Sequence, residues 1–474
     1  MTTTATATVP AQRRRLTPAE RAERGKQARA RVPRASHASA DLPAGRRDVV
    51  AMLEEQGRSR VPDLVPVRYG RMLVSPFTYY RGAALPMASD LAVTPVSGFG
   101  VQACGDAHLS NFGIFGTPER NLVFDINDFD ETLPAPWEWD VKRLAASLEI
   151  AGRDNEFTAK QRRTIVLAAV RSYREAMRDF ALQSNMDVFY ARVDVDQLRA
   201  QLKSQLTGRQ RKNWDKGTAK ARSTDSTRAL RKLTELTEAG PRIVADPPLI
   251  VPLSDLIGDA TVLEGEIAGL VAKYRRTLEP DRRHLLGQYE IADIARKVVG
   301  VGSVGTRCWI ILMLGRDGSD PLFLQMKEAQ RSVLAPYAGA SKHASHGQRV
   351  VAGQRLMQAA GDVMLGWLRT DATLDGEARS FYIRQLRDWK FSIDIATMVP
   401  DGMRLYGEMC GWTLARAHAR SGDRIAIAAY LGGSDEFDQA IAEYARSYAD
   451  QNERDYQALA DAAATGRIAV QRDL

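Results

Sequence analysis

The sequence predicts an α+β protein built from two lobes, and three observations lead to this prediction. First, 474 residues are too many for one small core and indicate two or three packed units. Second, short apolar runs broken by turn residues predict strands, while apolar residues at helical spacing predict helices. Third, these patterns follow the order helices, sheet, helices. We therefore expect a helical lobe with a functional loop at 41–285, a sheet-rich lobe at 286–395, and helices that complete the first lobe at 396–474.

The segment 1–40 is expected to be a disordered basic tail. It is rich in Thr, Ala, Arg and Pro without apolar periodicity, and it holds nine Lys and Arg residues against Glu20 and Glu23. Because the formal net charge of the whole chain is +8, most of the excess positive charge lies in this tail and not on a folded face. Nucleic-acid binding is therefore not expected, and a solvated extension is the simpler interpretation.

The bulk composition indicates a globular protein without a membrane partner. The chain is 44% hydrophobic and 26% charged, and no apolar run approaches the ~18 residues of a membrane span. Cys104, Cys308 and Cys410 are widely separated and lack CxxC spacing, which favours reduced buried thiols over a disulfide framework or a zinc site. Since the N-terminus also lacks the apolar stretch of a signal peptide, a cytoplasmic location is expected.

The chain elements follow from local patterns. Turn residues between apolar runs mark hairpins, and long segments with period 3.6 mark helices. We expect, in order, short strands around a functional loop at 90–135, helices at 137–205, a mobile loop or surface insertion at 206–228, three strands within 294–328, two more at 363–369 and 380–387, and helices at 402–420 and 435–461.

The most informative stretch is a Gly-Asp-Ala-His loop with an asparagine behind it. Asp106 and Asn111 are five residues apart, and Asp125 follows after a predicted hairpin. Phosphoryl transfer from ATP needs a carboxylate near the acceptor hydroxyl and oxygen ligands for Mg²⁺, and kinases place an Asp, an Asn and a second Asp at such spacing. The alternative is a polar loop in which Asp and Asn only cap turns. The combination with Gly105 and His108 favours the catalytic interpretation.

Three acidic residues downstream leave alternatives open. Asp125 lies nearer the usual spacing for the principal metal ligand, whereas Asp128 begins an Asp-Phe-Asp sequence that echoes the kinase Asp-Phe-Gly; we favour Asp125. Asp140 could brace the catalytic loop or could be a helix N-cap. We expect His108 to support the loop through hydrogen bonds, not to act as the base.

A glycine loop precedes a predicted strand. Gly300, Gly302 and Gly305 form a GxGxxG pattern that includes Ser303, and the residues that follow are β-branched and aromatic. A dinucleotide fold requires a helix directly after such glycines. Strand, glycine turn and strand is instead the kinase arrangement, in which backbone amides lie over the phosphates.

Lys327 lies in the next apolar strand and matches the kinase lysine that binds the nucleotide phosphates. The alternative is an edge lysine whose amine reaches water. Kinases pair this lysine with a Glu on the following helix, yet 330–361 contains no Asp or Glu. Gln348, Gln354 and Gln358 lie there instead, so Glu328 or a carboxylate from elsewhere must replace the usual partner.

The order of these motifs indicates a circular permutation. Lys327 follows the Asp106 loop, whereas ordinary kinases place the lysine first. The helix expected at 402–420 is of the kind that directly precedes the catalytic loop in phosphotransferases, so the two halves form one complete set. The chain resembles a protein-kinase-like fold, closest in its GDxHxxN loop to the aminoglycoside phosphotransferases.

The whole chain also resembles the bacterial domain of unknown function 2252 family. The resemblance covers about residues 45–460 and is carried by the Ser-Pro-Phe…Arg-Gly block at 75–82 and by the Gly-Asp-Ala-His block. Arg81 in the first block is either a ligand contact or part of a structural ion pair. The family supplies no substrate.

These expectations combine into an ATP-dependent phosphotransferase that acts on an unknown small-molecule or protein acceptor. Asp106 is the expected catalytic base; Asn111, with Asp125 or Asp128, is expected to bind Mg²⁺; and the glycine loop with Lys327 is expected to bind ATP. Transfer of an adenylyl group uses similar residues. The alternative class is a nucleotide-binding pseudokinase or a structural module without catalysis, and the oligomeric state is open.

Overall fold

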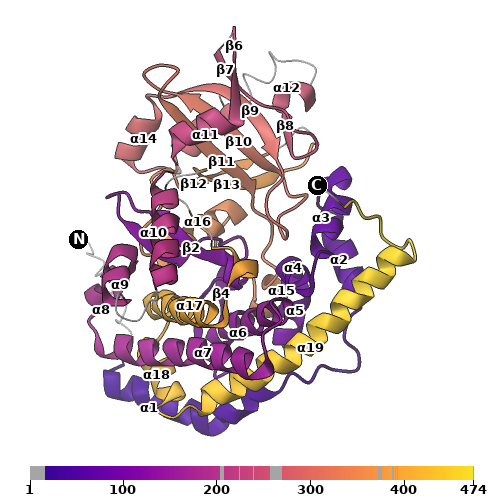
Figure 1. Ribbon diagram of the computed structural model, residues 1–474. Helices are drawn as coiled ribbons and strands as arrows, with labels where there is room; N and C mark the ends of the chain where they lie inside the picture. The colour runs from indigo at the N-terminus through magenta and orange to yellow at the C-terminus, as the bar shows by residue number, and fades with distance from the viewer. Residues whose placement is uncertain are drawn as a thin grey trace, which may run out of the picture.

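An antiparallel sheet lies above a body of helices in the computed structural model (Figure 1). The structure describes residues 16–472 apart from 203–207, 224, 239, 257–268, 372–375, 387–388, 390 and 392. Helices dominate the lower part and strands the upper part, so the predicted α+β class is confirmed.

The main sheet has six strands in the order β12-β13-β11-β10-β9-β8, with antiparallel pairing between neighbours. The hairpins predicted around the glycine loop and before the lysine strand are present, as are the two later strands. The strands span Ile250–Pro252 (β8), Glu290–Lys297 (β9), Cys308–Leu314 (β10), Pro321–Glu328 (β11), Gly366–Thr370 (β12) and Arg379–Gln385 (β13).

The two faces of this sheet contact different partners because strand side chains alternate between faces. On one face, strand residues such as Ile311 and Leu324 pack with Tyr274 and Leu278. Strand β8 also belongs to this sheet, although it precedes the sheet-rich lobe predicted at 286–395. On the other face lies Lys327, directly opposite Cys308 in the β10–β11 register.

The second face is covered by helix α11, Ser226–Leu233. Its residues Ala229 and Leu233 join an apolar cluster with four sheet residues of this face: Ala295, Ile310, Leu312 and Phe323. The preceding helix α10, Gly208–Arg222, packs its fully buried Ala221 against the helical body. The segment α10–α11 thus connects the helical body to this face of the sheet (Figure 1). The described residues of 206–228 are largely helical, so the expectation of a loop is wrong for them, whereas most of them are exposed, as in the alternative of a surface insertion.

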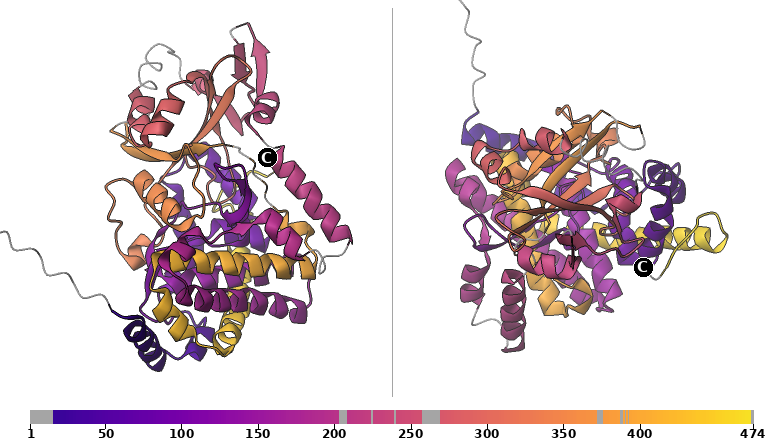
Figure 2. Two further views of the ribbon diagram at one scale, coloured as in Figure 1. Left: turned by 90° about the vertical axis from the view of Figure 1, so that its left-hand side faces the viewer. Right: turned by 90° about the horizontal axis from the view of Figure 1, so that it is seen from above.

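The helical body is organised around long helices that lie side by side. Helices α7 and α17 run next to each other (Figure 2), and small residues permit this contact: a Cβ at Gly411 would lie 2.2 Å from the carbonyl oxygen of Ala169. The antiparallel pair β1–β4 and the hairpin β2–β3 lie between this body and the main sheet (Figure 1). The elements span Gly100–Ala103 (β1), Phe112–Gly116 (β2), Leu122–Ile126 (β3), Leu133–Pro136 (β4), Trp137–Asp154 (α6), Ala159–Leu182 (α7), Pro400–Ser421 (α17), Arg424–Leu431 (α18) and Glu436–Ala464 (α19).

The N-terminal segment is more ordered than the sequence suggested. Residues Pro18–Arg31 form helix α1, which begins with a capping box between Thr17 and Glu20 and packs against α18. Arg21 pairs with Asp423 at 2.8 Å. The expectation of disorder across 1–40 is therefore wrong from residue 18 onward, while 1–15 lie outside the described residues.

The remaining helices surround these elements, and within the described ranges none is long and apolar enough to cross a membrane. Those near the site are Val49–Gly57 (α2), Val65–Met72 (α3), Pro76–Gly82 (α4), Ala84–Leu91 (α5), Ala335–Ala338 (α15) and His346–Met357 (α16); the others include Asn185–Tyr190 (α8), Val195–Leu202 (α9), Leu253–Leu256 (α12) and Pro280–Leu286 (α14). The short strands Val193–Asp194 (β5), Thr234–Thr237 (β6) and Gly240–Ile243 (β7) complete the described elements.

Candidate active site

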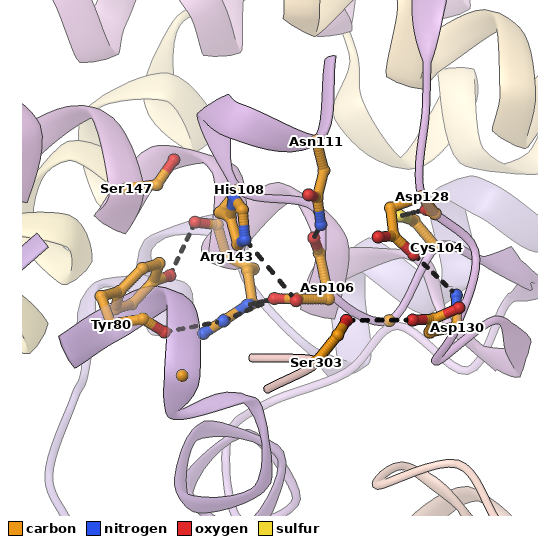
Figure 3. A network of polar contacts seen from close by, with 12 residues as sticks. Tyr80, Cys104, Asp106, His108, Asn111, Asp128, Asp130, Arg143, Ser147 and Ser303 are labelled. Carbon is orange, nitrogen blue, oxygen red and sulfur yellow. Dashed lines mark hydrogen bonds and ion pairs between the residues drawn. The ribbon is translucent and has the colours of Figure 1, made fainter. Parts of the chain in front are cut away.

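The predicted catalytic loop connects β1 to β2 and presents Asp106 at its centre (Figure 3). The Oδ1 atom of Asp106 accepts a hydrogen bond from Nε of Arg143 at 2.7 Å. Asn111 donates from Nδ2 to the carbonyl oxygen of Asp106 at 2.8 Å, so its spacing of five residues closes the loop on itself. The Asp106 side chain remains 20% exposed. The structure therefore brings Asp106 and Asn111 together, as predicted.

Asp140 braces this loop from helix α6. Its carboxylate accepts hydrogen bonds from the backbone N–H groups of Cys104 at 2.6 Å and Gly105 at 2.9 Å. His418 of α17 contacts the same carboxylate at 3.1 Å. Since α6 begins after Pro136 without a side-chain cap, the bracing interpretation holds and the N-cap interpretation does not.

Arg143, which holds Asp106, is itself fixed by the Ser-Pro-Phe…Arg-Gly block on α4. Its guanidinium lies over the Tyr80 ring at 4.2 Å and donates to the Tyr80 carbonyl oxygen at 3.0 Å. The Tyr80 hydroxyl donates back to the Arg143 carbonyl oxygen at 2.7 Å. This block therefore positions the catalytic loop through Arg143, a residue that the sequence interpretation missed.

His108 lies beside Asp106 but is not placed to act as a base. Its Nε2 is 3.6 Å from Oδ2 of Asp106, beyond ordinary hydrogen-bond distance. Burial, together with the charges of Arg81 and Arg143, holds the pKa of His108 well below its usual range. The imidazole is therefore neutral at pH 7.

Lys327 reaches across from the sheet to the loop that follows β3. Its Nζ lies 2.6 Å from Oδ2 of Asp130 and 3.7 Å from Oδ2 of Asp128. Burial alone would lower the pKa of Lys327, but these two carboxylates raise it well above its usual range. Asp130 is therefore the acidic partner of Lys327 that the segment 330–361 lacks, because Glu328 pairs instead with Arg379 at 3.0 Å.

The two aspartates respond in opposite directions to this arrangement. Burial and the charge of Asp130 raise the pKa of Asp128. For Asp130, burial would raise the pKa, but Lys327 and the Tyr382 hydroxyl, which donates to it at 2.6 Å, bring it below its ordinary value. Lys327 and Tyr382 therefore compensate the negative charge of Asp130 more fully than that of Asp128.

The glycine loop connects β9 and β10 and lies over these carboxylates. Ser303 Oγ is 3.4 Å from Oδ2 of Asp130, so the loop touches the opposite lobe (Figure 3). Arg60 donates to the carbonyl oxygens of Gly302, at 2.8 Å, and Val304. Gly305 has φ +87°, and a Cβ there would lie 3.0 Å from Cβ of Arg60. Only glycine satisfies this backbone without strain.

The remaining loop glycines have similar roles. Gly300 has φ +67°, and its carbonyl oxygen accepts from Nη1 of Arg71 at 2.7 Å. A Cβ at Gly302 would lie 3.0 Å from the carbonyl oxygen of Arg81. The loop is therefore held by its carbonyl groups to Arg60 and to Arg71 of α3, and it lies close to the end of α4 at Gly302.

A cavity of about 630 Å³ lies between the glycine loop and the catalytic loop. Charged and polar side chains from both lobes line it, as do three of the loop residues predicted to contact phosphates. The lining includes Arg81, Asp106, His108, Asn111, Asp128, Asp130, Glu131, Gly300, Gly302, Ser303 and Arg331. Lys327 does not line the cavity itself, but its partners Asp128 and Asp130 do. Among the predicted metal ligands, Asn111 and Asp128 therefore share one space with Asp106.

Asp125 does not belong to this cavity, which corrects the preference for it as the metal ligand. It is 1% exposed, pairs with the buried Arg416 of α17, and accepts from the backbone N–H of Ala359 at 2.7 Å. Its own Ile126 N–H donates to it at 2.8 Å. All the observed partners of Asp125 are thus structural, and the carboxylate at the end of the β3 segment that faces the cavity is Asp128.

The donor set offers a limited cation site. Within the described ranges, no group of three or more His, Cys, Asp or Glu side chains is arranged to hold a metal ion. Oxygen ligands suit Mg²⁺, which usually takes one or two carboxylates and completes its shell with water and phosphates. Asp128, with the amide oxygen of Asn111, fits that incomplete requirement.

Glu131 is a further cavity residue that the sequence interpretation missed. Burial raises its pKa to about 7, although Arg349 opposes this shift. It accepts from the backbone N–H of Val333 at 2.7 Å, and a Cβ at Gly105 would lie 2.5 Å from its carbonyl oxygen. The acidic run that begins at Asp128 was the available signal for both Asp130 and Glu131.

The fold and the cavity define an α+β protein with a charged site between an antiparallel sheet and a helical body. Residues 60–462 match the family described as uncharacterized protein conserved in bacteria, DUF2252. Because the match covers most of the chain, the protein belongs to this family. No curated protein and no solved structure gives a significant match.

Proposed function

We propose that this protein is an ATP-dependent phosphotransferase with a circularly permuted protein-kinase-like fold. The observation that carries the proposal is the ion pair of Lys327 with Asp130 and Asp128: the lysine lies on a strand that follows a glycine loop, and both aspartates line one cavity with Asp106. In kinases, a strand lysine beside an Mg²⁺-binding aspartate and a loop aspartate for the acceptor form the same set.

The order of elements in the sheet lobe supports this proposal. Glycine hairpin β9–β10, lysine strand β11, helix α16 and strands β12 and β13 follow the order glycine loop, lysine strand and helix of protein kinases. Lys327 contacts the aspartates of the other lobe and no acidic residue of α16, so the helix residues Gln354 and Gln358 bond to each other instead, at 2.9 Å.

The junction between α17 and β1 supports the permutation. Ser421, the last residue of α17, accepts through Oγ from the backbone N–H of Gln102 at 3.1 Å. Tyr406 of the same helix donates to the carbonyl oxygen of Leu109 in the catalytic loop at 2.9 Å. The helix expected to precede the catalytic loop therefore adjoins it in space, although it follows it in sequence.

The residues of the chain have distinct roles in the proposed transfer. Asp106 accepts the proton of the acceptor hydroxyl through its oxygen nearer the cavity, while Arg143 keeps the other oxygen fixed. The new O–P bond forms at the γ-phosphorus as its bond to the β–γ bridging oxygen breaks, and ADP leaves. Lys327 and the glycine loop offset phosphate charge, and Asp128 with Asn111 would hold Mg²⁺, which supplies further charge neutralisation when bound.

The test compares Asp106→Asn with wild type. The variant should bind Mg-ATP with affinity within about threefold of wild type but form no ADP, because the amide retains one hydrogen-bond acceptor and cannot take the acceptor's proton. Asp41→Asn, at an exposed position, is the matched control and should retain both properties. Loss of nucleotide binding by a folded Asp106→Asn protein would count against the assigned role.

A second candidate function is a nucleotide-responsive or structural module. Helix α11 favours it, because Ala229 and Leu233 cover the sheet face next to Lys327. A nucleotide with its phosphates beneath the glycine loop cannot place its base on that covered region unless α11 moves. Absence of wild-type binding at millimolar Mg-ATP would select the structural module, whereas binding without ADP formation would select the nucleotide-responsive one.

A further inference from the structure

Arg81 is a charged cavity residue whose side chain lacks a partner among the described residues. It lies on α4 directly after Tyr80 and lines the cavity with Asp106. Its Nε is buried and donates no hydrogen bond to any described residue. The ion-pair alternative that the sequence left open for Arg81 is therefore not realised in this part of the chain.

Two other buried arginines of the N-terminal segment have structural contacts with backbone carbonyl groups. Arg60 donates to the carbonyl oxygens of Gly302 and Val304, and Arg68 donates to the carbonyl oxygen of Gly82 at 3.0 Å. Both guanidinium groups thus fix backbone segments. Arg81 fixes none, although α4 holds it firmly through a capping box at Ser75.

An unpaired guanidinium at such a place carries a free-energy cost. Burial lowers the pKa of Arg81, and the charge of Asp106 opposes that shift only in part. Arginine nevertheless stays protonated at neutral pH. A cation that is removed from water without a partner destabilises the fold, and a bound anion would offset this cost.

The charge of Arg81 acts on the catalytic loop, although its backbone adjoins the glycine loop at Gly302. In Figure 3, Tyr80 and Arg143 lie on one side of Asp106, whereas Ser303, Asp128 and Asp130 lie on the other. Arg81 lines the same cavity, and its charge acts on Asp106 and on the neighbouring His108. An acceptor that presents its hydroxyl to Asp106 can therefore contact Arg81 as well, while Asp128 and Asp130 remain for the Mg-nucleotide.

We propose that Arg81 binds an oxyanion of the acceptor, so that the acceptor is a hydroxyl compound that also carries a carboxylate or phosphate group. This inference rests on the proposed phosphotransferase function and names its substrate class. A guanidinium binds both groups through two parallel N–H···O bonds, which would orient the neighbouring hydroxyl toward Asp106. Neutral polyols lack this second contact.

The first experiment measures anion binding without nucleotide. Inorganic phosphate is titrated calorimetrically into the full chain as wild type, Arg81→Gln, Arg81→Lys and Arg58→Gln, an exposed control at the end of α2. We expect at least tenfold weaker phosphate binding in Arg81→Gln and no change in Arg58→Gln. Arg81→Lys should show a smaller loss, because lysine keeps the positive charge but lacks the planar fork of the guanidinium. Circular dichroism checks that each variant is folded.

A second arm separates this site from the nucleotide site and distinguishes the two anion sources. Lys327→Met should retain phosphate binding within about twofold, because its amine lies beside Asp130 and not beside Arg81. ADP formation with Mg-ATP is then compared for glycerol, glycerate and glycerol 3-phosphate. The anionic acceptors should be preferred, and Arg81→Gln should raise their KM without raising the KM for ATP.

The outcomes are distinct. Phosphate binding that Arg81→Gln leaves intact, or an absence of phosphate binding by wild type at tens of millimolar, overturns the inference. Binding lost in Lys327→Met but kept in Arg81→Gln assigns the anion to the nucleotide site and also overturns it. Binding at Arg81 without ADP formation from any acceptor would instead contradict the proposed phosphotransferase function.

Discussion

Replacement of Lys327 by methionine tests whether this lysine serves structure or nucleotide binding. The Lys327 side chain is 3% exposed, and its two partners, Asp128 and Asp130, are 30% and 26% exposed. Removal of one partner of a buried ion pair costs about 3–5 kcal/mol, and the partial exposure of the carboxylates reduces the expected loss to roughly 2–4 kcal/mol in the free energy of unfolding. Lys26→Met, at an exposed position on α1, is the control.

The loss should depend on pH in a defined direction. The folded-state pKa of Lys327 is raised, so its contribution is fully present below the ordinary lysine pKa and is lost only at strongly alkaline pH. In the variant, Asp128 and Asp130 lose their cation, and their pKa values rise because two like charges remain close together. Protonation then relieves the repulsion, and the difference from wild type should shrink between pH 8 and pH 5. Urea unfolding at both pH values measures it.

The double variant Lys327→Met with Asp130→Asn separates the two roles. Removal of one carboxylate eliminates the uncompensated charge, so we expect most of the lost stability to return, since Tyr382 can still donate to the amide oxygen. Nucleotide binding should not return, because the cation assigned to the nucleotide phosphates is absent. Calorimetric titration of Mg-ATP measures this. If the second substitution restores no stability, or if the double variant binds Mg-ATP like wild type, the reasoning is refuted.

Three further predictions concern residues with different environments. Burial lowers the pKa of His37 from 6.5 to about 3, so the unfolded state binds the proton first and the free energy of unfolding falls as pH decreases below 6.5. His37→Gln should remove about 2 kcal/mol of this decrease between pH 6.5 and pH 5, as measured by urea unfolding. An unchanged pH dependence would contradict this. Asp125→Asn should lower the free energy of unfolding by about 3 kcal/mol, because it breaks the buried pair with Arg416. Asp128→Asn should leave the urea midpoint nearly unchanged but abolish the Mg²⁺ dependence of nucleotide binding in titrations. The reverse pattern would restore Asp125 as the metal ligand. Leu233→Asp should displace α11 from the sheet and strengthen Mg-ATP binding several-fold. If hydrogen exchange shows that α11 is displaced but the affinity for Mg-ATP is unchanged, the helix does not obstruct the nucleotide.

The local elements of the fold could be predicted from the sequence because they depend on local periodicity. The strands around the glycine loop and the helix at 402–420 have apolar patterns that the structure confirms. Helix α1 also had a readable signal, the Thr17–Glu20 capping box with Pro18 at its first position, but its basic composition obscured it. Helix α10 had no comparable signal, because its polar sequence becomes helical only where Ala221 packs on the body.

The site could be predicted only as far as spacing determines it. Asp106 and Asn111 are five residues apart, and their loop closes by a local hydrogen bond. Asp130 and Lys327 are 197 residues apart, and Asp125 and Arg416 are 291 residues apart. Spacing in the sequence does not show which of two nearby aspartates pairs with which distant cation. The preference for Asp125 failed for this reason, and the missing acidic residue on α16 was replaced from the other lobe.

The order of the elements along the chain has a physical consequence for how the site is assembled. Every contact between the glycine loop and the catalytic loop joins segments that are far apart in sequence, so closure of the site requires both lobes to be formed first. Arg60 and Arg71 then hold the glycine loop by its carbonyl groups, from a segment that precedes the catalytic loop in the chain. This N-terminal segment thereby fixes the glycine loop at the edge of the cavity that Asp106 also lines. Because the same segment carries Arg81, it both fixes the glycine loop and presents the cation that we assign to the acceptor.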